Sequence, residues 1–209
     1  MEFECPMDKA SDQSTSKPGR LRLAAVGDLL VGVDPTGRRP LRDPRDALTE
    51  LRELLASCDV VLGNLECTLP GDGAMVETQP RLIATPEAVA AWARSGFNAF
   101  TLANNHAFDC DLPGFRRLRA LLDDLGAAWF GAGENLSESL RGAILEANGV
   151  RLGFLGGADE ASGTRPFATA DGWGVALLKT GLLVEGIRAM RERVDHVIGQ
   201  LLLLRQRAL

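Results

Sequence analysis

The stretch AFTLANNHAFD, residues Ala99–Asp109, carries the clearest structural signal in the chain. Its first five residues form a short apolar run that is typical of a buried strand. The run leads into Asn104, Asn105 and His106, and Asp109 follows three residues later. The stretch therefore predicts a strand that delivers polar side chains of a ligand type to its carboxyl end.

Two earlier stretches repeat this arrangement. Asp28 follows the apolar run LRLAAV at residues 21–26, and Asn64 and Glu66 come at the end of DVVLGNL at residues 59–65. Ligand sites in parallel sheets gather outside the carboxyl ends of the strands. The polar side chains of all three stretches are therefore predicted to share one site.

Helical and extended patterns alternate along the rest of the chain. Helices are expected at residues 44–57, 86–95, 112–125 and 182–193, and further strands at 128–131, 143–147, 151–155, 175–178 and 194–198. The first helix is expected to bury the apolar stripe Ala47, Leu48, Leu51, Leu54 and Leu55. Asn148-Gly149 gives the strongest hairpin signal. The alternation predicts an α/β fold with a mostly parallel sheet covered on both faces.

Composition limits the classes of function. The 209 residues fit a single domain, and 45% hydrophobic and 24% charged residues are the balance of an ordinary globular protein. A net charge of −5 argues against electrostatic binding to nucleic acid or anionic lipid. The four cysteines form no C-x-x-C pair, so reduced thiols are expected.

The amino-terminal segment, residues 1–19, is polar and is expected to be a disordered leader. It lacks the apolar core of a signal peptide. The longest apolar run, Leu201–Leu204, is far shorter than the roughly 20 residues of a membrane-spanning helix. A cytoplasmic location is the expectation from these two features.

Carboxylate, amide and imidazole groups together suit a hard or borderline divalent ion such as Mn²⁺, Fe²⁺, Zn²⁺ or Mg²⁺. Such ions neutralise a phosphoryl group during attack by water, so an acidic protein can bind phosphate without a basic patch. Each residue also has a structural interpretation: Asp28 as a turn residue, Glu66 as a solvated strand end, His106 as a structural histidine and Asp109 as a helix cap. Their joint position at three consecutive strand ends favours a functional site.

Three motifs, in this order and spacing, resemble those of a known family. They are VGDLLVG (Val26–Gly32), VVLGNLECTL (Val60–Leu69) and TLANNHAFDCDLPGF (Thr101–Phe115). The family is that of the CapA/PgsA poly-gamma-glutamate capsule-synthesis proteins, which are relatives of the calcineurin-like metallophosphoesterases. The later stretches NGVRLGFLGGAD and GWGVALL are similar to the family's hairpin and to a following strand. The resemblance implies a metallophosphoesterase-like layered sandwich of sheets and helices.

The resemblance also implies roles for individual residues. Asp28, Glu66 and Asn105 match metal ligands, His106 matches the catalytic residue that assists the leaving group, and Asn64 and Asp109 match supporting positions that orient the ligands. The implied cofactor is a divalent metal ion. The implied ligand is a phosphate-containing or polyanionic small molecule.

The chain departs from the family pattern after the hairpin. It has only two histidines, His106 and His196, whereas the family continues with further histidine motifs. His196 lies inside the strand expected at 194–198 and is interpreted as structural. From Gly199 the sequence resembles no family segment. The predicted organisation is an incomplete domain at residues 20–198, missing its C-terminal strands, and a divergent tail at 199–209.

This departure bears on activity and on assembly. The remaining ligands are too few for two tightly held ions, so a single weakly bound ion is the most that we expect. The leading hypothesis is a capsule-biosynthesis protein with an impaired metal-dependent phosphoesterase-like site. The alternative is a non-catalytic binding or regulatory module that keeps the fold. An unpaired sheet edge would favour self-association.

Overall fold

The computed structural model describes residues 19–30, 44–72 and 81–203. Nearly all of the expected leader, and the tail beyond residue 203, lie outside these ranges. No helix in the described ranges is long and apolar enough to cross a membrane. The thiols of Cys58, Cys67 and Cys110 are free, as expected.

The first sheet contains four parallel strands in the order in which they occur along the chain. They are β1 (Leu23–Asp28), β2 (Val60–Asn64), β3 (Ala99–Thr101) and β4 (Ala128–Phe130). All residues of β2 and β3 are buried, because these strands are covered on both faces. The three strands predicted to carry the site are therefore confirmed, and they are neighbours.

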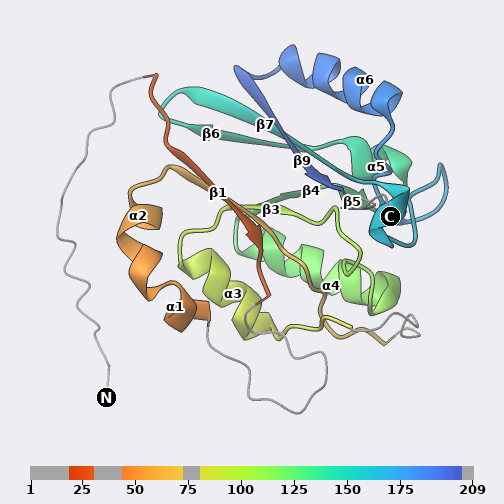
Figure 1. The fold of residues 1–209 in the computed structure, drawn as a ribbon, viewed down its shortest axis with the longest axis horizontal. Coiled ribbons are helices and arrows are strands. Elements are labelled where there is room, and N and C mark those ends of the chain that lie inside the picture. Colours follow the sequence, from red (N-terminus) through yellow and green to blue (C-terminus); the bar gives the residue numbers. More distant parts are fainter. Residues whose placement is uncertain (1–18, 31–43, 73–80, 204–209) are drawn as a thin grey trace, which may run out of the picture.

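Helices cover one face of this sheet (Figure 1). They are α1 (Pro44–Ala47), α2 (Arg52–Ala56), α3 (Pro86–Arg94) and α4 (Asp111–Asp124). The single helix expected at 44–57 is wrong, because a 3₁₀ turn at Thr49–Leu51 separates α1 from α2. This turn has fewer residues per turn than an α-helix and so rotates the apolar stripe away from the sheet. Leu48 and Leu55 are buried, whereas Leu51 is 42% and Leu54 58% exposed.

A second sheet covers the other face of the first, where helices were expected. β7 (Val150–Ala158) lies between β6 (Ala143–Ala147), which is antiparallel, and β9 (His196–Leu202), which is parallel. Phe130 of the first sheet stacks on Phe154 of the second, with ring centroids 5.6 Å apart. The helix α6 (Thr180–Arg191) covers the outer face of the second sheet (Figure 1). The fold is thus a layered α/β sandwich with two sheets.

The hairpin between β6 and β7 is confirmed. Asn148 and Gly149 both have positive φ angles, 53° and 74°, as a tight two-residue turn requires. His196 belongs to β9, as expected, but it is the first residue of the strand and is exposed. The strand continues to Leu202, four residues beyond the predicted domain boundary.

Several short elements were not expected. They are β5 (Ala132–Gly133), α5 (Leu136–Leu140) and a 3₁₀ turn at Glu160–Ser162. The strand expected at 175–178 is found only as β8 (Gly174–Val175), which pairs with β5, and as a single bridge between Leu177 and Ala158. Elements of two to five residues are too short to show a hydrophobic period.

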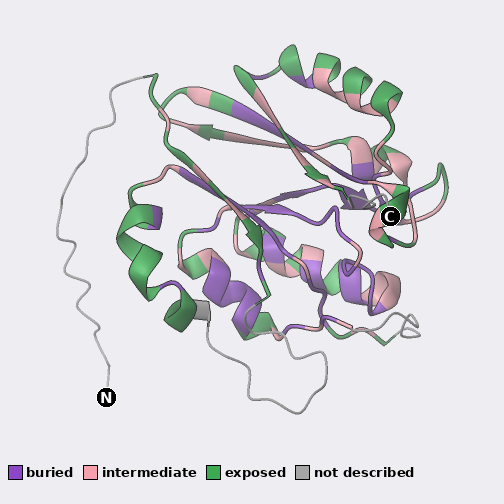
Figure 2. Ribbon diagram, in the orientation of Figure 1, coloured by how far each residue is buried: buried purple, intermediate pink, exposed green. Residues whose placement is uncertain are grey.

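Burial is uneven across the layers. Buried residues concentrate in the first sheet and on the sheet-facing sides of α3 and α4, whereas α2 and α6 are mainly exposed (Figure 2). Phe100, Phe115 and Leu118 have no exposed surface in this core. The carboxyl ends of the first sheet therefore rest on the best-packed part of the molecule.

Candidate active site

Strand register brings the predicted side chains to one place. Asp28 is the last residue of β1 and pairs with Asn64, the last residue of β2, which pairs in turn with Thr101 at the end of β3. Because the strands are parallel, the segments that follow them leave the same edge of the sheet. Glu66 and His106 lie on these segments, and their side chains come within 3.8 Å of each other.

Asn64 lies at the centre of a network of polar side chains. Its Nδ2 donates a hydrogen bond to Asp28 Oδ1 at 2.8 Å and a longer one to Glu66 Oε2 at 3.5 Å. Its Oδ1 accepts a hydrogen bond from Asn104 Nδ2 at 3.0 Å. Asn64 is only 2% exposed, so this amide is fixed on both sides. It can therefore orient the two carboxylates.

The carboxyl groups of Glu66 and Asp28 are neighbours, because both accept hydrogen bonds from Asn64 Nδ2. The pKa of Glu66 is raised from 4.5 to about 7, mainly by burial and also by the hydrogen bond and the charge of Asp28, whereas the charge of His106 lowers it. Two adjacent carboxylates repel each other when both are ionised. A proton or a cation between them would relieve that repulsion.

The ring of His106 is held by Asp109. His106 Nδ1 lies 2.8 Å from Asp109 Oδ2, and the same oxygen accepts a hydrogen bond from the backbone N–H of Leu82 at 2.7 Å. Asp109 is 1% exposed. The alternative that Asp109 caps the following helix is wrong, because Cys110 is the N-cap of α4 and no side chain caps that end.

Asn104 takes part in the network although no role was predicted for it. Its Nδ2 donates to the backbone oxygen of Leu65 at 3.0 Å, and its Oδ1 accepts from the backbone N–H of His106 at 3.0 Å. The side chain thus ties the His106 loop to the end of β2. Its place directly after a buried strand was the available signal. Asn105, the predicted amide ligand, is partly exposed, and its side chain makes no hydrogen bond within the described ranges.

The donor set can be compared with the needs of a divalent ion. Asp28 and Glu66 supply two adjacent carboxylates, and their proximity fits the chemistry of a hard cation. Within the described ranges, however, no three side chains of His, Cys, Asp or Glu are grouped so that they could hold a metal ion. Within these ranges the two carboxylates are therefore the ligands available to a divalent ion.

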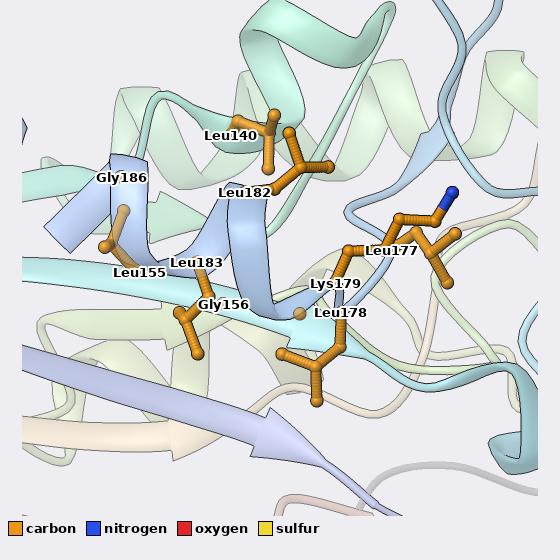
Figure 3. A pocket seen from close by; sticks show the side chains of 10 residues that line it. Leu140, Leu155, Gly156, Leu177, Leu178, Lys179, Leu182, Leu183 and Gly186 are labelled. Atoms are coloured by element: carbon orange, nitrogen blue, oxygen red, sulfur yellow. The ribbon is translucent and has the colours of Figure 1, made fainter.

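An apolar pocket elsewhere in the molecule is too small for a substrate. It lies between β7 and α6, and Leu155, Leu177, Leu182 and Lys179 are among the residues that line it (Figure 3). Its volume of about 20 Å³ has room for little more than a water molecule. None of the predicted site residues lines it.

A solved structure shares this arrangement of layers. The NAD nucleotidase of Haemophilus influenzae superposes with a TM-score of 0.51 and 15% sequence identity, over 87% of this chain and 34% of that protein. At this identity the similarity concerns the fold alone. It confirms the metallophosphoesterase-like layered sandwich.

Two curated relatives come from Sinorhizobium fredii (strain NBRC 101917 / NGR234), the uncharacterized proteins y4sH and y4uA. Each is 28% identical over 155 residues, which cover 71% of this chain and 32% of the relative. The chain therefore spans about a third of the length of the curated relatives that it matches.

The sequence profile of the bacterial capsule synthesis protein PGA_cap matches residues 22–201. The match includes every residue of the candidate site and both sheets except Leu202, the last residue of β9. The motifs at Asp28, Asn64–Glu66 and Asn104–Asp109, the layered fold and this match lead to one conclusion: the chain belongs to the bacterial capsule synthesis protein family PGA_cap.

Proposed function

We propose that this chain acts in the synthesis of a poly-gamma-glutamate capsule through a weakened, metal-dependent phosphoesterase-type site. The observation that carries the proposal is the grouping of Asp28 and Glu66 on the shared donor Asn64 Nδ2, with Glu66 Oε1 3.8 Å from Nε2 of the oriented His106 ring. Ionising the partly buried Glu66 carboxyl next to the exposed carboxylate of Asp28 is costly for stability. Such an arrangement is typical of sites that bind a cation or move a proton.

Asp28 and Glu66 would hold the ion, together with the side-chain oxygen of Asn105. When bound, a divalent ion would lower the pKa of a coordinated water and neutralise charge on a phosphoryl group. Asn64 keeps both carboxylates in place, since its amide donates a hydrogen bond to each of them. The ion would replace the proton that Glu66 otherwise retains near neutral pH.

His106 is placed to act as a general acid. The carboxylate of Asp109 accepts a hydrogen bond from His106 Nδ1, which leaves Nε2 directed toward Glu66 at 3.8 Å. A protonated Nε2 can donate to the leaving oxygen of a phosphoester. Asp109 and Asn104 fix the ring and its backbone, so neither needs to touch the substrate.

A second candidate is a non-catalytic module that binds a phosphate-containing or polyanionic small molecule. The specific observation in its favour is that the described ranges contain no group of three acidic, histidine or cysteine ligands suited to a metal ion. In that case Asp28, Glu66 and His106 would form a polar binding surface without hydrolysis. Metal binding and turnover separate the two candidates.

Mn²⁺ binding provides the first test. Electron paramagnetic resonance of free Mn²⁺, titrated against the protein at pH 8, measures weak binding without a washing step. We expect about one ion per chain. Binding should be lost in Asp28→Ala and Glu66→Gln and retained in Asp72→Ala, which removes an exposed carboxylate paired with Arg117.

Hydrolysis of bis(p-nitrophenyl) phosphate in the presence of Mn²⁺ provides the second test. We expect slow turnover that falls about 100-fold or more in His106→Gln, because a general acid contributes on the order of 10²–10⁴ in rate. The Asp72→Ala control should keep the wild-type rate. A folded protein that binds no Mn²⁺ and shows no turnover would overturn the enzymatic proposal and leave the binding module.

A further inference from the structure

A second polar site lies at the opposite end of the first sheet. A groove of about 330 Å³ opens at the amino end of β4, beside the start of β6 and the end of α6. Its polar lining consists of Asp123, Trp129, Arg141 and Arg193. A volume of this size is sufficient for a small ligand. None of the residues at the carboxyl ends of β1–β3 takes part.

The two arginines in this groove lack acidic partners. Arg141 and Arg193 are exposed, and neither forms an ion pair with any residue in the described ranges. By contrast, Arg116, Arg117 and Arg119 all pair with carboxylates of Asp72, Glu134 or Glu138. Two unpaired guanidinium groups on one groove produce a local positive potential on a chain whose net charge is negative.

The groove is partly preorganised. The guanidinium of Arg141 lies 5.7 Å from the centroid of the Trp129 ring, a cation–π contact that restricts this side chain. Trp129 is itself fixed, because it is 8% exposed and its Nε1 donates to Asp123 Oδ1 at 2.8 Å. Asp123 is the one acidic residue of the lining, and this bond engages one of its oxygens.

We propose that this groove binds an oxyanion, a phosphate or carboxylate group of a small molecule, between Arg141 and Arg193. Guanidinium groups present paired N–H donors whose geometry matches the oxygens of both anions. Trp129 positions Arg141, and Asp123 holds the indole. The site does not depend on a metal ion or on hydrolysis, so it stands independently of the proposed function.

The indole N–H of Trp129 reports on the groove directly. In ¹⁵N-labelled protein the resonance of this N–H can be assigned with the variant Asp123→Asn. The substitution changes the exposed side chain that accepts the hydrogen bond from Trp129 Nε1, so this resonance should shift. Sodium phosphate and sodium glutarate are then titrated separately at constant ionic strength. We expect a saturable shift of this resonance, with the dissociation constant about tenfold higher in Arg141→Gln and in Arg193→Gln.

Arg94→Gln is the matched control, because Arg94 is an exposed arginine that lines a different groove beside α2 and α3. It should leave the dissociation constant unchanged. Saturation by phosphate alone, by glutarate alone or by both supports the site and assigns the anion that it prefers. No saturable shift with either anion, or an equal loss in Arg94→Gln, overturns the proposal. All three arginines are exposed, so the variants are expected to fold.

Discussion

The two sheets of the sandwich differ in how completely they are buried. β2 and β3 are buried throughout, between helices on one side and the second sheet on the other. The outer cluster beneath α6 contains only three buried side chains, Leu155, Met190 and Val194. Every side chain of the candidate site lies at or after the carboxyl end of β1, β2 or β3. The polar network is thus supported by the layer whose backbone has the least freedom to move.

Core truncation is the strongest way to test this difference. Phe115→Ala should destabilise the protein by about 3–5 kcal/mol, because the ring is fully buried and stacks on Phe108 with centroids 4.5 Å apart. Met190→Ala should cost about 2 kcal/mol, since few neighbours surround it and they can relax. Urea unfolding measures both values. Equal losses would mean that the two layers are equally well packed.

A second prediction concerns the polar network. Asp109→Ala should destabilise the protein by about 2–3 kcal/mol, because it leaves the N–H of Leu82 and the ring of His106 without their buried acceptor. Asp72→Ala serves as the control and should change stability by less than about 0.5 kcal/mol, since its ion pair is exposed. A loss in Asp109→Ala as small as that of the control would show that the network contributes only orientation.

A third prediction concerns pH. The pKa of Glu66 is raised in the folded protein, so its contribution to stability is fully present below about pH 4.5 and is lost as the pH rises through 7. Glu66→Gln removes this titration. Above pH 8 the free energy of unfolding of the variant should exceed that of the wild type by about 1–2 kcal/mol, a figure reduced because Glu66 is partly accessible to solvent. This difference in stability should disappear near pH 4.5. Urea midpoints across this range provide the measurement, and a gap that widens toward low pH would contradict it.

The smallest effect on stability is expected at the edge of the second sheet. Within the described ranges β9 pairs with β7 alone, and Leu201 is 37% exposed on a strand that carries no acidic or basic residue except His196. We expect weak self-association through this edge, and Leu201→Lys should reduce it while changing stability by less than about 0.5 kcal/mol. Sedimentation velocity over a range of concentrations measures it. Unchanged association in Leu201→Lys would exclude this edge.

Much of the first sheet could be predicted because β1, β2 and β3 each combine an apolar run with a polar end. Asp28, Asn64 and the His106 loop each follow such a run, so parallel topology alone places them together. The second sheet was harder to predict from the sequence. Whether strands join one sheet or two depends on which strand edges pair, and a hydrophobic run does not show which edges will pair. The network partner of Asp109 was equally hidden, since the N–H of Leu82 comes from a segment 27 residues away.

The order of strands in the first sheet also bears on how the protein folds. Each of β2, β3 and β4 pairs with the strand that precedes it in the sequence, so pairing can extend stepwise as the chain emerges during synthesis. β9 instead pairs with β7 only after the intervening β8 and α6 have been made. The residues from Asp28 to Asp109 can therefore assemble into their final geometry while β9 is still untranslated.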